Sequence, residues 1–89
     1  MPDRQGPKTV DLITAGVVTD ERVDAAVAAV MADPCTGRFA VADGLHLDLA
    51  AVVRHSRRAR MVLRDLDATE GLRRGLLRRA ILDMRPAKT

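Results

Sequence analysis

Phe39 is the only aromatic residue in a chain of 89 residues, which contains neither Trp nor Tyr. A chain of this length forms one domain, and it buries only about 60–65% of the surface that its unfolded form exposes. Its core must therefore be built from Ala, Val and Leu side chains, which make many small contacts in place of a few large ones. Such a core favours closely packed helices, or a partner that completes it.

The spacing of the apolar residues predicts an all-α fold, a small bundle of three to four helices. We expect a flexible leader at 1–8, a single helical domain at 9–85 and a tail at 86–89. One short β-hairpin near 38–47 is the alternative to a loop, because Asp43-Gly44 is a strong hairpin signal. We favour the loop, in which Phe39 enters the core.

The first half of the chain contains one open and one clear prediction. The segment Thr9–Ala15 fits a short helix that stops at Gly16, and it also fits a strand with alternating apolar residues. Next, Thr19 is a good helix cap, and the acidic residues that follow it suit a first helical turn. Because the residue before a proline avoids helical angles, Asp33 ends this helix, which we place at about 20–32.

Apolar residues at helical spacing predict a long central helix over 47–66. Met61 and Val62 lie outside its apolar stripe, which indicates either a second apolar contact or a break after Ser56. Across these elements, the following residues are expected in the core: Leu12, Val23, Val27, Val30, Phe39, Leu49, Val52, Leu63, Leu66, Leu72, Leu76, Ala80 and Ile81.

A basic amphipathic C-terminal helix is predicted after Asp67. Asp67 and Glu70 stand three residues apart, as in a capping box with Asp in place of Ser or Thr. Gly71 and Gly75 follow, and each glycine costs a soluble helix up to about 1 kcal/mol relative to Ala. The pair indicates either a close approach of another backbone or a frayed first turn.

The charge of the chain is divided between two parts. Up to residue 53 there are four basic and eight acidic residues, a net charge of −4. Residues 54–85 contain ten arginines and four acidic residues, a net charge of +6, and Lys88 adds one more positive charge. The total of +3 therefore hides a strongly basic C-terminal part. Such a surface attracts phosphate or an acidic protein face at long range.

Seven of these arginines are the candidate contacts to an acidic partner or to nucleic acid, and two neighbouring residues are candidate apolar contacts. The arginines are Arg57, Arg58, Arg60, Arg73, Arg74, Arg78 and Arg79, and the apolar residues are Met61 and Val62.

The stretch from Leu49 to Leu63 resembles a helix-turn-helix DNA reader, because small residues lie in its first part and Ser56-Arg57 would open the recognition helix. The resemblance implies a helix that enters the major groove of duplex DNA. The sequence departs from the pattern at Arg54, where the turn usually has Gly, and at Arg60, which stands at a position that is usually buried. One uninterrupted amphipathic helix with a solvated arginine face explains the same residues, and we favour it.

Several functional classes find no support in the sequence. Cys35 is the single cysteine, so no disulfide can form within the chain, and Cys35, His46 and His55 have no recognised metal-ligand spacing. We find no catalytic motif and no apolar run long enough for a membrane span. We therefore predict no catalytic, cofactor-binding or metal-binding residues, no membrane partner and a cytoplasmic location.

The predicted function is a non-catalytic protein-protein interaction module, an accessory or regulatory subunit. Its partner is another protein or a second copy of the chain, since the opposite charges of the two parts permit self-association as a homodimer. The alternative is a regulator that binds duplex nucleic acid through the basic C-terminal helices. Stacking on single strands is disfavoured, because no aromatic residues are interleaved with the arginines.

Overall fold

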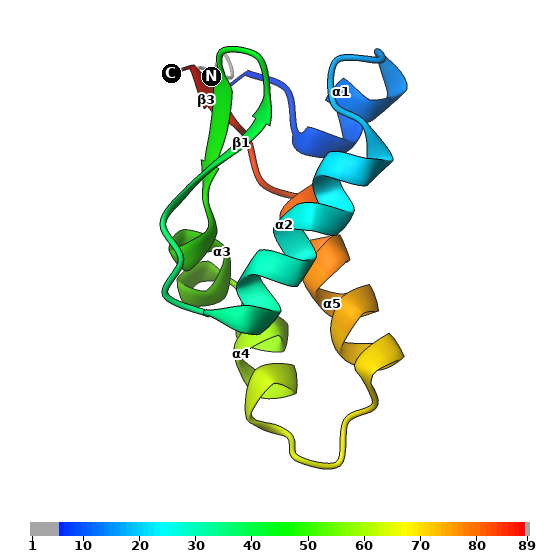
Figure 1. Ribbon diagram of the computed structural model, residues 1–89, viewed down its shortest axis with the longest axis vertical. Helices are drawn as coiled ribbons and strands as arrows, with labels where there is room; N and C mark the ends of the chain where they lie inside the picture. Colours follow the sequence, from blue (N-terminus) through cyan, green and yellow to red (C-terminus); the bar gives the residue numbers. More distant parts are fainter. Residues whose placement is uncertain (1–5, 89) are drawn as a thin grey trace.

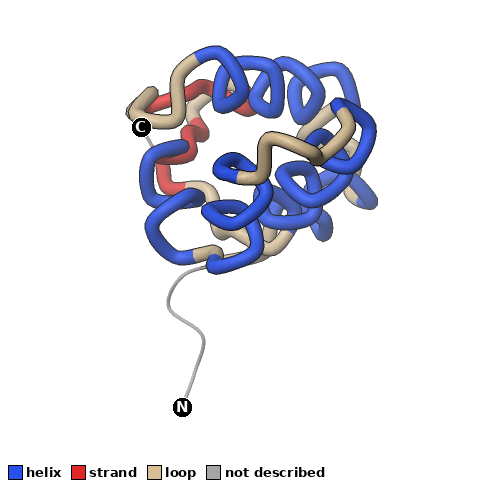
Figure 2. Tube along the Cα trace, turned by 90° about the horizontal axis from the view of Figure 1, so that it is seen from below, coloured by secondary structure: helices blue, strands red, loops and turns tan. Residues whose placement is uncertain are grey.

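The computed structural model describes residues 6–88, and within that range the chain is mostly helical with a small antiparallel sheet. The elements are α1 (Thr9–Thr14), α2 (Asp20–Ala32), β1 (Arg38–Ala42), β2 (Leu45–Asp48), α3 (Leu49–His55), α4 (Arg57–Arg64), α5 (Glu70–Leu82) and β3 (Ala87–Lys88). The sheet lies toward one end of the long axis, and the loop that joins α4 to α5 lies at the other end (Figure 1). Seen from below, the strands gather at one side of the helices (Figure 2).

Local sequence signals account for α1 and α2. The open choice at Thr9–Ala15 is settled as a helix, and Gly16 follows it with φ of 80°, a left-handed conformation that favours glycine. The Thr19 side chain caps α2, since it accepts a hydrogen bond from the Arg22 N–H at 3.2 Å. The bounds of α2 confirm the helix predicted at 20–32.

The predicted all-α bundle of three to four helices is corrected, because residues 6–88 contain five helices and a small three-stranded antiparallel sheet. The segment 38–47 is a hairpin and not a loop: β1 pairs with β2, and Gly44 provides the turn with φ of 75°. The predicted tail at 86–89 contributes β3, in which Ala87 pairs with His46 of β2. The predicted leader at 1–8 lies outside the described residues up to position 5, and Lys8 is already the N-cap of α1.

The long central helix predicted over 47–66 is wrong, because the chain leaves helical geometry at Ser56, where φ is −111° and ψ is 107°. Ser56 ends α3 and caps α4, and its Oγ accepts a hydrogen bond from the Ala59 N–H at 3.1 Å. Serine side chains compete in this way with an unbroken helical ladder. Met61 and Val62 lie outside the predicted apolar stripe, and the break after Ser56 that they indicate is present.

The C-terminal helix α5 contacts each of the helices α1 to α4. Its start also differs from the prediction, because Thr69 and not Asp67 is the N-cap, and its side chain accepts a hydrogen bond from the Leu72 N–H at 3.1 Å. The core around α5 contains small aliphatic side chains, as the composition requires. Its buried residues are Val18, Val23, Ala26, Val27, Val30, Val41, Leu47, Leu49, Val52, Ala59, Leu77 and Ile81.

Two residues that were expected in the core lie outside it. Leu66 is 91% exposed and Leu72 is 51% exposed. Because α4 ends at Arg64, Leu66 falls in the loop, and Leu72 lies in the first turn of α5 next to that loop. Five other expected residues, Leu12, Phe39, Leu63, Leu76 and Ala80, are only partly buried.

Hydrogen bonds join the start of α1 to the residues just after α5. Thr9 is fully buried, and both its N–H and its Oγ1 donate hydrogen bonds to the Met84 carbonyl oxygen, at 2.8 and 2.9 Å. Arg85 Nε donates a further bond to the Gly6 carbonyl at 3.0 Å. These bonds attach α1 to the end of α5.

The burial pattern yields a stability test with a matched control. Leu77→Ala removes a fully buried side chain and should lower the free energy of unfolding by about 2–5 kcal/mol. Leu66→Ala removes the same atoms from an exposed position and should change it by less than about 0.5 kcal/mol. Urea denaturation of both variants measures the difference, and equal reductions would contradict the described core.

Candidate interaction surface

Arg78 lies at the centre of an ion-pair cluster that joins α5 to α2. Its Nη2 is 2.6 Å from Asp20 Oδ1, and its Nη1 is 2.8 Å from Asp24 Oδ1. The arginine side chain is 34% exposed, whereas the two carboxylates are more open to solvent. This arginine therefore neutralises part of the acidic half of the chain and is already occupied.

Arg60 and Arg73 are held by backbone carbonyl oxygens. Arg60 Nη1 donates to the carbonyls of Val53, at 3.3 Å, and of Arg54, both at the C-terminal end of α3. The last carbonyls of a helix have no partner within it, so Arg60 satisfies two of them across the break. Arg73 Nη2 donates to the Asp65 carbonyl at 2.7 Å and fixes the α4–α5 loop. Both side chains support the fold.

Arg74 and Arg79 each form an ion pair one helical turn away within α5. Arg74 Nε is 3.3 Å from Glu70 Oε2, and Arg79 Nε is 3.5 Å from Asp83 Oδ2. All four side chains are substantially exposed, and exposed pairs of this kind contribute about 0.3–0.5 kcal/mol. A partner can therefore compete for either arginine at little cost.

Arg57 and Arg58, at the start of α4, are exposed, and neither forms an ion pair with any residue in the range 6–88. Arg64 at the end of the same helix shares both properties, although the sequence did not single it out. The unpaired positive charge of the basic C-terminal part is therefore concentrated on α4. Arg64 differs from the engaged arginines only because they have partners in the folded chain, and the sequence does not reveal those partners.

Large apolar side chains are exposed beside this charge. Met61 of α4 is 61% exposed, and two further exposed side chains are Leu66, in the loop that follows, and Leu72, in the first turn of α5. Val62, the second predicted apolar contact, is 4% exposed and belongs to the interior. We call Met61, Leu66 and Leu72 the apolar tip of the α4–α5 hairpin.

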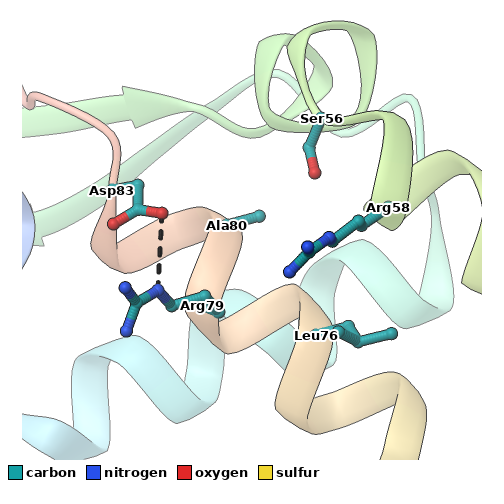
Figure 3. A pocket seen from close by; sticks show the side chains of 6 residues that line it. All are labelled: Ser56, Arg58, Leu76, Arg79, Ala80 and Asp83. Carbon is teal, nitrogen blue, oxygen red and sulfur yellow. Dashed lines mark ion pairs between the residues drawn. The ribbon is translucent and has the colours of Figure 1, made fainter.

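A shallow pocket of about 330 Å³ lies between the start of α4 and the C-terminal half of α5. It is lined by Ser56, Arg58, Leu76, Arg79, Ala80 and Asp83, so it brings together two of the seven predicted arginines. In Figure 3, Arg58 extends from α4 toward α5, whereas Arg79 turns toward Asp83. The pocket therefore presents one unpaired and one weakly paired guanidinium.

Gly71 and Gly75 lie on the exposed side of α5. A Cβ atom placed on either would meet no atom within 4 Å among the parts of the chain that the structure describes. The close backbone approach considered from the sequence is therefore absent between these glycines and the rest of residues 6–88. What remains at this position is a flat, open stretch of helix surface.

The searches for other kinds of site and for relatives gave no match. Over residues 6–88, no helix is long and apolar enough to cross a membrane, and no three His, Cys, Asp or Glu side chains are grouped to hold a metal ion. No protein-family model, curated protein or solved structure matches the chain. The function must therefore be inferred from the surface of the described residues.

The ion pairs of Arg78 provide a test of whether arginines with ion pairs stabilise the fold and arginines without them do not. Arg78→Gln should lower the free energy of unfolding at low salt by about 0.5–1 kcal/mol, because it breaks two ion pairs. Arg57→Gln removes the same charge without such a reduction. Urea denaturation at low and high salt should show the Arg78 effect shrinking as salt screens the pairs. Equal behaviour of the two variants would mean that the ion pairs do not contribute.

Proposed function

We propose that this chain is a non-catalytic protein-protein interaction module that binds an acidic partner protein through α4 and the α4–α5 loop. The observation that carries the proposal is the apolar tip, in which Leu66 is 91% exposed, together with the unpaired arginines of α4. Exposed apolar side chains with a charged rim are typical of protein interfaces. Arginine is also enriched among residues that dominate binding energy.

The ion pairs of Arg78 favour a foreign partner over a second copy. In self-association, the basic α4 of one copy would use the acidic half of another, but three of the seven acidic residues in 6–53 are already paired with arginines: Asp20 and Asp24 with Arg78, and Asp48 with Arg54. A head-to-tail contact between unlike surfaces also does not close into a dimer and tends to form chains. An accessory or regulatory subunit of a larger assembly fits these constraints better than a homodimer.

The apolar tip provides the test of this function. The double variant Met61→Ser and Leu66→Ser should no longer bind the partner, because it removes two exposed apolar side chains while leaving the core and the charge intact. Affinity capture with the tagged protein, followed by identification of the retained proteins, compares the variant with the wild type.

The matched control is Val10→Ser and Val17→Ser, which removes two exposed apolar side chains from the α1 region. The control should retain the partner, and sedimentation velocity should show wild-type protein as a monomer without it. A set of captured proteins that is the same for wild type, variant and control would contradict the proposal.

Duplex nucleic acid is a second candidate partner, which the break at Ser56 favours. α3 and α4 are separate helices, and α4 opens with the exposed Arg57 and Arg58, as the resemblance to a helix-turn-helix reader implies. The connection is a single residue, whereas that motif uses a turn of about three to four residues. The exposed leucines of the tip also have no role in binding phosphate.

A salt titration tests this second candidate. If α4 binds duplex DNA, the wild type should retard a duplex at low salt, and the affinity should fall steeply as salt rises. Replacing Arg57, Arg58 and Arg64 with Gln should flatten the logarithmic salt dependence by about 0.9 for each phosphate that is no longer neutralised. A gel-shift series measures both, and absence of retardation at low salt excludes this candidate.

A further inference from the structure

We propose that the pocket between α4 and α5 receives a carboxylate side chain of the partner, which is bound by the Arg58 guanidinium and the Ser56 hydroxyl. This inference rests on the proposed interaction function and specifies its anchoring site. The occupant is an acidic amphipathic helix of a foreign protein, lying along the exposed face of α5.

The polar groups of the pocket suit a carboxylate. Arg58 is exposed and has no ion pair with any part of the described chain, so its planar fork is available for two parallel N–H···O bonds. Ser56 Oγ accepts the Ala59 N–H at 3.1 Å, which leaves the hydroxyl hydrogen to donate to an incoming oxygen. Ser56 stands on the Arg58 side of the pocket, which places the two donors together (Figure 3).

The other walls favour a protein side chain over a phosphate group. Leu76 and Ala80 form an apolar floor that can cover the methylene groups of a glutamate. Asp83 contributes a negative charge at the far side, where it is paired with Arg79 at 3.5 Å. In Figure 3, the Asp83 carboxylate and the Arg58 side chain lie on opposite sides of Ala80, so a single carboxylate bound at Arg58 would be kept away from the negative charge of Asp83.

The shape of α5 suits a helical occupant. Leu72, Leu76 and Asp83 follow one another at spacings of four and seven, so they lie on one face of the helix. Between them, Gly75 is exposed and leaves open space where a side chain would stand, which allows a second backbone to approach closely. A partner helix can therefore place an apolar residue at Leu72 while its glutamate reaches Arg58.

The acidic start of α2 in a second copy is a poorer occupant than a foreign helix, which is why the proposal commits to a foreign helix. Arg78 holds Asp20 and Asp24 at 2.6 and 2.8 Å, so two of the three acidic side chains in residues 20–24 would have to give up ion pairs before they could bind another copy. A partner helix with unpaired glutamates has no such cost.

The test uses a synthetic helix and a matched pair of variants. The probe is a blocked helical peptide of about 18 residues with Leu and Glu on one face, and its counterpart has Gln in place of Glu. Arg58→Gln and Arg38→Gln each remove one exposed positive charge that forms no ion pair within residues 6–88, but Arg58 lines the pocket whereas Arg38 lies in β1. Fluorescence anisotropy measures the dissociation constants, and circular dichroism verifies that both variants are folded.

The expected result is selective. Arg58→Gln should weaken binding of the Glu peptide by about tenfold or more, since it removes hydrogen bonds between charged groups, and Arg38→Gln should weaken it less than about twofold. Arg58→Gln should have no further effect on the Gln peptide, because the two changes remove the same interaction.

Equal weakening by the two variants, or no binding of the Glu peptide, would contradict carboxylate binding in the pocket. The proposed interaction function would then be judged by the affinity-capture experiment alone. If the wild type self-associates in sedimentation and Arg58→Gln abolishes that self-association, the pocket binds a second copy of the chain. This result would contradict the proposal that the occupant is a foreign protein. Failure of the capture experiment together with selective peptide binding would instead contradict the proposed function while retaining the pocket.

Discussion

The structure depends on the burial of α5 among all the other helices. Leu77 and Ile81 are fully buried, and the same core includes side chains from α2, from the hairpin and from α3 and α4. With one partly buried aromatic residue, no single side chain can organise this core, so many small aliphatic contacts must form together. Because α5 contacts each of the helices α1 to α4, this core forms only when residues 70–82 are in place. The position of every surface group on α4 depends on that same packing.

The break at Ser56 is the second constraint, because it decides which way α4 points. An unbroken helix over 47–66 would carry the direction of α3 through to Arg64. Instead, Ser56 caps the new helix, and Arg60 returns to the open carbonyls of α3. These two side chains replace the backbone bonds that the break removes. They thereby hold Arg58 at the pocket and Met61 at the surface.

The sequence predicted the elements whose signals are local. Thr19, the two acidic residues after it and the Asp33-Pro34 stop define both ends of α2, and its predicted bounds were correct. Asp43-Gly44 likewise indicates the hairpin, although a loop is the favoured prediction for this segment. A break within a strongly periodic stretch is harder to predict, because a serine in a helix and a serine that caps a new helix look alike without their tertiary contacts. The predicted burial of Leu66 is wrong for this reason, because it assumes one continuous helix over 47–66.

The candidate site could be predicted only as a charge excess. Ten arginines in residues 54–85 indicate a basic surface, but their number says nothing about which remain free. Arg78, Arg60 and Arg73 are engaged by groups that are far apart or unremarkable in the sequence: carboxylates more than 50 positions away, helix-end carbonyls and a loop carbonyl.

What makes an arginine available to a partner is the absence of a competing acceptor within the described chain. Three of the arginines on α4, Arg57, Arg58 and Arg64, meet this condition. The net charge of +6 therefore overstates the charge available to a partner, and the arrangement of acceptors determines where it is available. An acidic partner would encounter it beside the exposed leucines, where water is most easily excluded from the charge pairs. Salt should then slow the encounter more than it weakens the apolar contact, because screening acts mainly on the long-range attraction.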